Sequence, residues 1–317
     1  MKLRLGVLGC ANIAKRSVIP AILSIPDYEL IAVASRTKEK ANEYASLFNC
    51  EYIIGYQELL DRKDIDVIYM PLPTGLHEEW VLKALDAGKH ILIEKSLAMN
   101  YESSIKMVEK AKEKDLLIME NFMFLYHGQH QFVKNLINKN KIGEIRCFRS
   151  SFGFPPLEED NFRYNNALGG GSLLDAAAYT VRASQLFLGN DLCVKAANLN
   201  FEGKEVDIYG GAYLSSKSGF FAEVAFGFDN FYQCNYEIWG SKGKIIAQRA
   251  FTPGENYKPT ITLEQQGEVF NYEVDAENHF VSLLNEFKRC VNENDKENKY
   301  EEILNQSRLL SELKALS

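Results

Sequence analysis

The stretch "LRLGVLGCANIA", residues 3–14, decides how the chain begins to fold. Its first half, residues 3–8, is an apolar run typical of a buried strand. The second half carries the spacing G-x-A-x-x-A, with Gly9, Ala11 and Ala14 at the three small positions. A glycine permits a tight turn, and small residues let a helix return closely over the strand. The stretch therefore predicts a strand, a tight turn and a helix in direct succession.

This turn also has the features of a phosphate-binding site. Ala11 is small enough for the backbone to approach a ligand, and the amides of Asn12 and Ile13 would open the helix toward an anion. Together with Gly9, these residues would hold the pyrophosphate of a dinucleotide. The alternative is a strand-to-helix turn that binds nothing. The place of the turn in a β-α-β unit favours the ligand.

Strand patterns alternate with helical patterns over residues 1–121. Further strands are expected at residues 29–34, 66–70, 90–93 and 116–119. Apolar residues recur at helical spacing between them, for example at Trp80, Val81, Ala84 and Leu85. This alternation predicts an α/β fold, with a doubly wound parallel sheet of the Rossmann type as the N-terminal domain.

Residues 122–317 follow a different pattern and predict an α+β domain. Strands are expected at residues 144–154, 194–202, 206–214, 219–228 and 232–239, with a hairpin at "WGSKGKI". These strands predict an open, mainly antiparallel sheet, interrupted by a long helix at about 170–188. Helix returns from about residue 278 and can pack back on the first domain. Residues 291–302, "VNENDKENKYEE", are interpreted as a solvated connection.

Composition excludes several classes of protein. The formal net charge of the 317 residues is −7, so no basic surface for nucleic acid or an anionic membrane is expected. No run of about 18 apolar residues occurs. The first apolar run ends at Asn12, too early for a signal peptide. Six scattered cysteines without a Cys-x-x-Cys pair indicate reduced thiols, a cytoplasmic protein and no zinc site.

The end of the second strand indicates which dinucleotide is bound. An NAD site usually has an acidic residue there for the ribose hydroxyls. This chain instead has "ASRTKEK", with Ser35, Arg36 and Lys38 at that position. A hydroxyl and a guanidinium suit a 2′-phosphate, so NADP(H) is preferred over NAD(H). A surface basic cluster is the alternative.

Three further strand ends are polar, and parallel strands place such ends at one crevice. The loop "PLPTGLH" would put Leu72 and Pro73 beside a nicotinamide ring. His77, the last residue of this loop, would contact the cofactor or merely begin a helix. The following strand ends on Glu94 and Lys95. The last strand ends on "ENF", which contributes Asn121.

The helix at 170–188 offers a second set of polar groups. Asp175 and Tyr179 are four residues apart and share one helix face. Three glycines, 169–171, let the backbone come close to a ligand at the helix start. A buried tyrosine bonded to a neighbouring aspartate is the alternative. Arg163, on the preceding loop, would bind a substrate diphosphate or remain solvated.

These motifs, in their order, resemble one known family. "GCANIA", "ASR", "PLPTGLH", "HILIEK", "ENFMF" and "GGGSLLDAAAY" are similar to the glucose–fructose oxidoreductase and inositol dehydrogenase superfamily over nearly the whole chain. "FRYNNALGGGSLLDAAAYTVRASQLFLG" looks most like sugar-nucleotide 3-ketoreductases of deoxysugar biosynthesis. The resemblance implies that Lys95, Asp175 and Tyr179 face the nicotinamide and the substrate. Ser96 stands where the family has proline.

The resemblance implies an NADP-dependent oxidoreductase that reduces a keto group, at C3, on a nucleotide-linked deoxysugar. Lys95 and Tyr179 would stabilise and protonate the developing oxyanion, because an ammonium makes a nearby phenol a better acid. Asp175 would hold a substrate hydroxyl or orient Lys95. A dehydrogenase of free sugars or dihydrodiols, and a non-catalytic dinucleotide sensor, are the alternatives. Homodimers or homotetramers through the open sheet face are expected.

Overall fold

The computed structural model describes residues 2–317, which fold into two compact units. The first unit ends at Phe122 and is joined by Phe280–Leu304. The second unit comprises Met123–His279 and Asn305–Ser317. No helix within residues 2–317 is long and apolar enough to cross a membrane.

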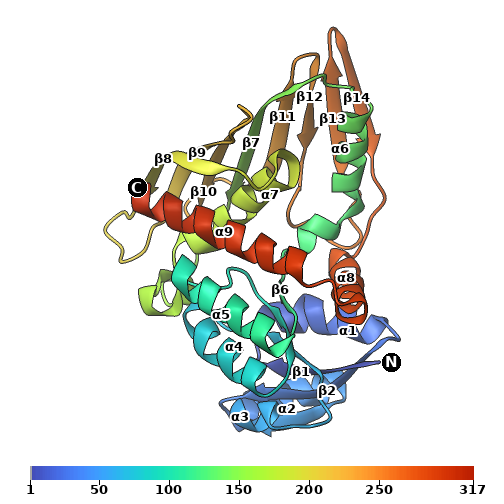
Figure 1. Ribbon diagram of the computed structural model, residues 1–317, viewed down its shortest axis with the longest axis vertical. Helices are drawn as coiled ribbons and strands as arrows, with labels where there is room; N and C mark the ends of the chain where they lie inside the picture. Colours follow the sequence, from blue (N-terminus) through green and yellow to red (C-terminus); the bar gives the residue numbers. More distant parts are fainter. Residues whose placement is uncertain (1) are drawn as a thin grey trace. The chain divides into compact units, whose positions relative to one another are not determined.

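The first unit contains the parallel sheet expected from the sequence (Figure 1). Its strands lie in the order β3-β2-β1-β4-β5-β6, and all neighbouring strands are parallel. They are β1 (Leu3–Leu8), β2 (Tyr28–Ser35), β3 (Glu51–Ile54), β4 (Val67–Met70), β5 (His90–Ile93) and β6 (Ile118–Glu120). The strand order reverses at β1, which pairs with β2 on one side and β4 on the other. Dinucleotides bind at such a reversal.

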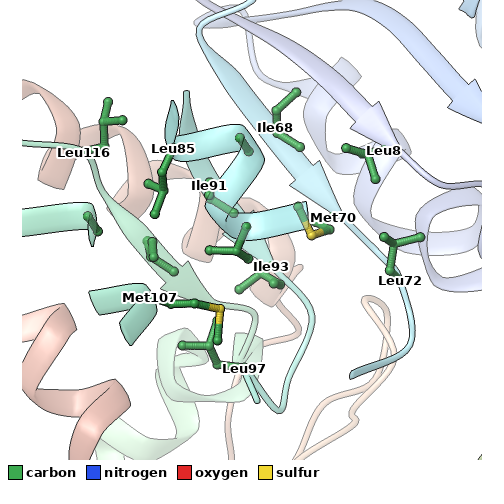
Figure 2. Close-up of a cluster of buried hydrophobic side chains, with 14 of the residues drawn as sticks. Leu8, Ile68, Met70, Leu72, Leu85, Ile91, Ile93, Leu97, Met107 and Leu116 are labelled. Atoms are coloured by element: carbon green, nitrogen blue, oxygen red, sulfur yellow. The ribbon is translucent and has the colours of Figure 1, made fainter. Parts of the chain in front are cut away.

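The unit also contains helices. They are α1 (Ile19–Ser24), α2 (Lys38–Phe48), α3 (Gln57–Leu60), α4 (His77–Asp86), α5 (Tyr101–Lys114), α8 (His279–Glu293) and α9 (Glu297–Leu316). Of these, α1 to α5 connect the strands, whereas α8 and α9 follow late in the chain and α9 belongs to this unit only up to Leu304. Figure 2 shows part of the resulting core, in which side chains of β4 and β5 meet those of α4 and α5. Ile68, Ile91, Leu85 and Met107 are all fully buried there. Full burial of one such side chain contributes about 1.5–3 kcal/mol.

The second unit contains an open sheet of eight strands in the order β14-β13-β12-β11-β7-β10-β9-β8. Only the β7–β10 pair is parallel, so the expectation of a mainly antiparallel sheet is confirmed. The strands are β7 (Ile145–Gly153), β8 (Cys193–Asn200), β9 (Tyr209–Ser215), β10 (Phe221–Gly227), β11 (Gln233–Gly240), β12 (Gly243–Ala247), β13 (Thr260–Gln265) and β14 (Glu268–Glu273). The predicted hairpin is the β11–β12 turn.

Two helices of this unit, α6 (Gly128–Asn138) and α7 (Ala178–Leu188), lie along the sheet (Figure 1). Phe187 of α7 stacks on Phe148 of β7, with ring centroids 5.7 Å apart. Helix α7 therefore covers the face of the sheet to which Phe148 belongs. A π-helical turn, Leu173–Ala177, precedes α7 directly.

The interpretation of residues 291–302 as a solvated helix connection is correct only in part, because the segment joins α8 to α9 and half of its residues are exposed, but three are buried. Helix α9 begins at Glu297, and Lys296, Lys299 and Tyr300 are all buried within the first unit. The Tyr300 hydroxyl donates to the carbonyl of Leu116 at 2.6 Å. The many charged residues of this segment suggested full exposure, but several of its side chains are buried and form hydrogen bonds.

Candidate active site

The turn after β1 has the close approach that its small residues predict. Gly9 has a φ of +121°, which L side chains rarely adopt. A Cβ at this position would lie 2.9 Å from Cδ2 of Leu72, in the loop after β4. Glycine thus lets the turn lie against that loop at the strand-order reversal.

The helix after the turn offers amide groups to an anion. The Lys15 N–H donates to the carbonyl of Ala11 at 3.2 Å. The amides of Asn12 and Ile13 precede this bond and so belong to the first turn, whose N–H groups lack helical acceptors. Asn12 is exposed, whereas Ala14 is fully buried. The arrangement fits the pyrophosphate of a dinucleotide.

The end of β2 carries the expected basic group. Arg36 and Lys38 are exposed, and Ser35 is buried, with its hydroxyl accepting the Thr37 N–H at 3.3 Å. Burial raises the pKa of Tyr56, and the charge of the nearby Arg36 guanidinium opposes that rise. Arg36 therefore lies beside Tyr56 at this strand end, and no carboxylate occupies residues 35–38.

His77 is fully buried, and its ring joins two of the loops at the strand ends. Its Nδ1 lies 3.1 Å from the carbonyl oxygens of both Ser96 and Leu97. Its Nε2 lies 2.8 Å from the carbonyl oxygen of Leu72. Burial lowers the pKa of His77, and the three carbonyls oppose that shift. The ring thus fixes the spacing of the two loops. The sequence did not indicate that His77 contacts backbone carbonyls.

Glu94 is held by two side chains from neighbouring strands. Its Oε1 accepts the Tyr69 hydroxyl at 2.6 Å and the Asn121 amide at 2.6 Å. Tyr69 is fully buried in β4, and Asn121 follows β6. The strand ends that contribute Glu94 and Asn121 therefore meet, as the parallel topology predicts.

The residues after Lys95 are fixed in a similar way. The Leu97 N–H donates to Oε1 of Glu120 at 2.8 Å, and both residues are buried. The Lys95–Ser96 peptide bond is cis. Sequence reasoning overlooked Tyr69, because it lies inside a strand pattern, whereas Glu120 was part of the polar strand end "ENF" and only its bond with Leu97 was not predicted. A polar residue in an otherwise apolar parallel strand was the available signal.

The second unit holds the other polar set. Tyr179 is 7% exposed and packs among Phe152, Phe124 and Phe251, with ring centroids 4.9, 5.8 and 5.7 Å away. Its hydroxyl lies 3.9 Å from Sδ of Met123. Apolar walls around a phenol strengthen any electrostatic interaction that the hydroxyl makes.

Asp175 lies in the π-helical turn, and Arg163 pairs with it. The Arg163 Nε donates to Oδ2 of Asp175 at 2.5 Å. The two side chains are 32% and 17% exposed. Arg163 is thus neither a purely solvated residue nor dedicated to a diphosphate, because a carboxylate already shares its charge.

The remaining histidines are structural in character. His127 and His279 approach edge to face, with ring centroids 6.1 Å apart, and His130 contacts the hydroxyl of Tyr236 at 3.0 Å. Within residues 2–317 no group of three His, Cys, Asp or Glu side chains is arranged to hold a metal ion.

Comparison with known proteins agrees with this geometry. Residues 3–122 match the model of an oxidoreductase family with an NAD-binding Rossmann fold, and residues 130–246 match the GFO/IDH/MocA C-terminal domain. A dTDP-3,4-didehydro-2,6-dideoxy-α-D-glucose 3-reductase from Saccharopolyspora spinosa is 43% identical over 290 residues, covering 91% of this chain and 87% of its own. An NADP-dependent D-xylose 1-dehydrogenase from Haloferax volcanii is 30% identical over 90% of this chain and 88% of its own.

A solved structure extends the similarity to the whole chain. The 3-ketoreductase KijD10 from Actinomadura kijaniata, in complex with NADP and TDP-benzene, superposes with a TM-score of 0.97 at 38% identity. The match covers 100% of this chain and 98% of that one. From its dinucleotide turn to its open C-terminal sheet, the chain belongs to the GFO/IDH/MocA family of oxidoreductases.

Proposed function

We propose that this oxidoreductase uses NADPH to reduce the C3 keto group of a nucleotide-linked deoxysugar. The observation that carries the proposal is the similarity, over nine tenths of the chain, to reductases named for that reaction. The Ser35–Arg36 pair supports NADP(H), since a guanidinium and a hydroxyl suit a 2′-phosphate. The weaker similarity to a sugar dehydrogenase keeps oxidation of a free sugar as the second candidate.

The first unit would hold the cofactor. Gly9, Ala11, Asn12 and Ile13 would contact the pyrophosphate, and Ser35, Arg36 and Lys38 the 2′-phosphate. The nicotinamide would lie near Leu72, Pro73, Glu94, Lys95 and Asn121. We assign His77 a supporting role, because its ring is fully buried against backbone carbonyls. When bound, NADPH supplies the hydride.

Lys95 and Tyr179 would serve the substrate oxygen. A carbonyl that accepts a hydride develops negative charge, which an ammonium stabilises. The same oxygen needs a proton, for which the Tyr179 hydroxyl and the Lys95 ammonium are the donors in this chain. Asp175, held by Arg163, would accept a hydroxyl of the sugar, and Arg163 would also reach the diphosphate. We propose that both Lys95 and Tyr179 are needed.

The substrate is tested with NADPH and dTDP-3,4-didehydro-2,6-dideoxy-α-D-glucose, followed at 340 nm and by NMR of the product. We expect NADPH oxidation and a new C3 alcohol. D-xylose and a trans-dihydrodiol with NADP⁺ form the comparison set. Faster turnover of either of these contradicts the keto-sugar assignment. NADPH binding with no oxidation of NADPH by the keto sugar, and no reduction of NADP⁺ by D-xylose or the dihydrodiol, would indicate a sensor instead.

The residues are tested by Tyr179→Phe and Lys95→Met, with Tyr232→Phe and Lys83→Met as controls at exposed or half-buried sites in the same units. General acid catalysis and oxyanion stabilisation are each worth about 100-fold or more, so we expect kcat to fall by about that factor in each active-site variant. NADPH affinity, measured separately by fluorescence, should stay within about twofold for Tyr179→Phe. Undiminished turnover in either variant removes that residue from the mechanism.

We further propose a homodimer formed through the outer face of the second unit's sheet. That face carries Trp239, Arg149, Glu223 and Tyr213, which the strand register places next to one another. Trp239 is 50% exposed, and the Arg149 guanidinium lies 5.5 Å from its ring. Aromatic and arginine side chains of this kind are typical of interface centres.

Light scattering after size exclusion tests this proposal. We expect a dimer for the native chain and a monomer for Trp239→Glu, because the substitution removes a large aromatic side chain from the interface and adds a charge that association would have to desolvate. Phe231→Glu, at an 86% exposed position outside the strands, is the matched control and should remain dimeric. A native chain that elutes as a monomer at micromolar concentration would rule the interface out.

A further inference from the structure

We propose that Asp207 is a positioning residue of the active site, which holds the start of the helix carrying Asp175 and Tyr179. Asp207 lies in the connection between β8 and β9, 35 residues from Ser172. No motif in the sequence relates the two segments.

The carboxylate of Asp207 acts as a cap for that helix. Its Oδ2 accepts the Ser172 hydroxyl at 2.6 Å and the Leu173 N–H at 2.6 Å. Its backbone carbonyl accepts the Ser172 N–H at 2.8 Å. The side chain is 7% exposed, so these bonds are protected from water. Burial raises the pKa of Asp207, and the bonds from Ser172 and Leu173 oppose that rise.

The helix needs an acceptor from elsewhere, because it has no cap of its own. Ser172 has helical backbone angles, φ −68° and ψ −25°, and its side chain makes no capping bond to the helix. The first amides of a helix lack internal acceptors, and a carboxylate suits its positive end. The first turn, Leu173–Ala177, is also π-helical, a geometry rarely stable without tertiary support.

The glycines before the helix make room for this contact. A Cβ on Gly171, whose φ is +108°, would lie 2.3 Å from Oδ1 of Asp207. A Cβ on Gly170 would lie 2.4 Å from the carbonyl oxygen of Arg163, which accepts the Gly171 N–H at 2.9 Å. The helix start is therefore held on one side by Asp207 and on the other by the loop whose guanidinium pairs with Asp175.

Asp175 and Tyr179 follow Leu173 by two and six residues, so a displaced first turn moves both groups. A misplacement of about 1 Å can cost about 100-fold in rate. Asp207 touches neither group, and we infer that it acts on the reaction only through the helix. Its loss should therefore slow the chemical step and leave NADPH binding to the first unit unchanged.

This inference rests on the proposed function, and the experiment separates the two. We compare Asp207→Ala, Asp207→Asn and Ser172→Ala with Asp191→Ala, a control at an exposed carboxylate that accepts the Lys217 N–H at 3.3 Å in the same unit. The measurements are kcat and KM for the keto sugar, NADPH affinity, and the primary isotope effect with deuterated NADPH.

We expect kcat of Asp207→Ala to fall about tenfold or more with an increased isotope effect and NADPH affinity within about twofold. Asp207→Asn retains an acceptor oxygen and should recover most of the rate. Ser172→Ala loses one hydrogen bond to Asp207, and its kcat should fall about threefold. This variant keeps the test available if Asp207→Ala does not fold. Asp191→Ala should match the native chain.

An unchanged kcat in Asp207→Ala overturns the inference. A lower kcat with an unchanged isotope effect also overturns it, because that result reports only a smaller folded fraction. Tyr179→Phe and Asp175→Asn are measured beside these variants. If the native chain does not turn over the keto sugar, the proposed function itself is wrong, and if both variants keep full turnover, the roles proposed for Tyr179 and Asp175 are wrong. If these two variants lose turnover while Asp207→Ala does not, only the role of Asp207 is wrong.

Discussion

At the scale of single residues, buried side chains hold the residues on either side of Lys95, for which we propose a catalytic role. Glu94, directly before Lys95, is bound by Tyr69 and Asn121, and the residues after Lys95 are bound by Glu120 and His77. Hydrogen bonds to a charged acceptor contribute about 1.5–3 kcal/mol each. Lys95 is therefore placed by its neighbours on both sides, although serine follows it where the family has proline.

We propose that Arg36 contributes most to the preference for NADP(H), and Arg36→Ala tests this. Loss of one charge-assisted bond to a phosphate costs about 1.5–3 kcal/mol, so NADPH affinity should fall about 10- to 100-fold. NADH has no 2′-phosphate, and its affinity should change by less than about twofold. Titration of both cofactors by fluorescence measures the two values.

Lys63→Ala is the control for Arg36, because it removes one exposed positive charge just before β4, at the opposite end of the sheet. It should leave both affinities unchanged. Equal losses of NADPH and NADH affinity in Arg36→Ala would mean that Arg36 contacts a part common to the two cofactors.

At the scale of elements, strand prediction succeeded for most of the apolar strands, and it missed two polar strands together with β13, whose Ile261 and Leu263 are buried. The bounds of β1 and β5 agree with the sequence pattern residue for residue. Strand β3, "EYII", and strand β14, "EVFNYE", were overlooked, because most of their side chains are exposed or charged. Apolar periodicity detects only strands that bury a face.

The π-helical turns lay beyond the reach of sequence patterns. One, Ala14–Val18, follows the dinucleotide turn, and the other, Leu173–Ala177, carries Asp175. Such turns are rare and are frequently found at functional sites. Leu173–Ala177 is contacted by Asp207, which no local spacing relates to the helix. The polar residues at the strand ends could be predicted from the sequence, but the contacts that hold them could not.

Helix α9 supplies a test at this scale, through Lys296 in the turn before it. Its Nζ donates to the carbonyl and the carboxylate of Asp115, at 2.5 and 2.6 Å, and its side chain is 7% exposed. Lys296→Ala leaves the Asp115 carbonyl without this donor and should lower the free energy of unfolding by about 1–3 kcal/mol. Urea denaturation measures the change.

Lys106→Ala is the matched control, because Lys106 pairs with Glu78 at 2.6 Å on the surface, where the two side chains are 61% and 38% exposed. Exposed pairs contribute about 0–1 kcal/mol, so this variant should be close to the native chain. Equal losses in the two variants would show that burial of Lys296 adds nothing.

At the scale of the whole molecule, burial keeps the histidines neutral in both units. All five histidines of the chain have lowered pKa values, with burial as the largest cause in each. The pKa falls to about 4 for His90 and to about 3 for His130 and His279. An unfolded histidine has a pKa of about 6.5, so acid protonates the unfolded chain first.

Stability should therefore be greatest above about pH 6.5 and should fall as the pH falls toward 4. Each buried histidine contributes a slope of up to about 1.4 kcal/mol per pH unit, because the unfolded chain binds the additional proton. Urea midpoints at pH 7.5, 6.5 and 5.5 measure this slope in a range that lies above the ordinary pKa values of carboxyl groups. His90→Asn isolates one contribution. The Leu117 N–H donates to His90 Nδ1 at 3.0 Å, and the side-chain oxygen of an asparagine can accept the same bond. The slope of stability against pH should therefore decrease only by the contribution of His90. Parallel curves for the two proteins would show that His90 takes up its proton equally in the folded and unfolded chains.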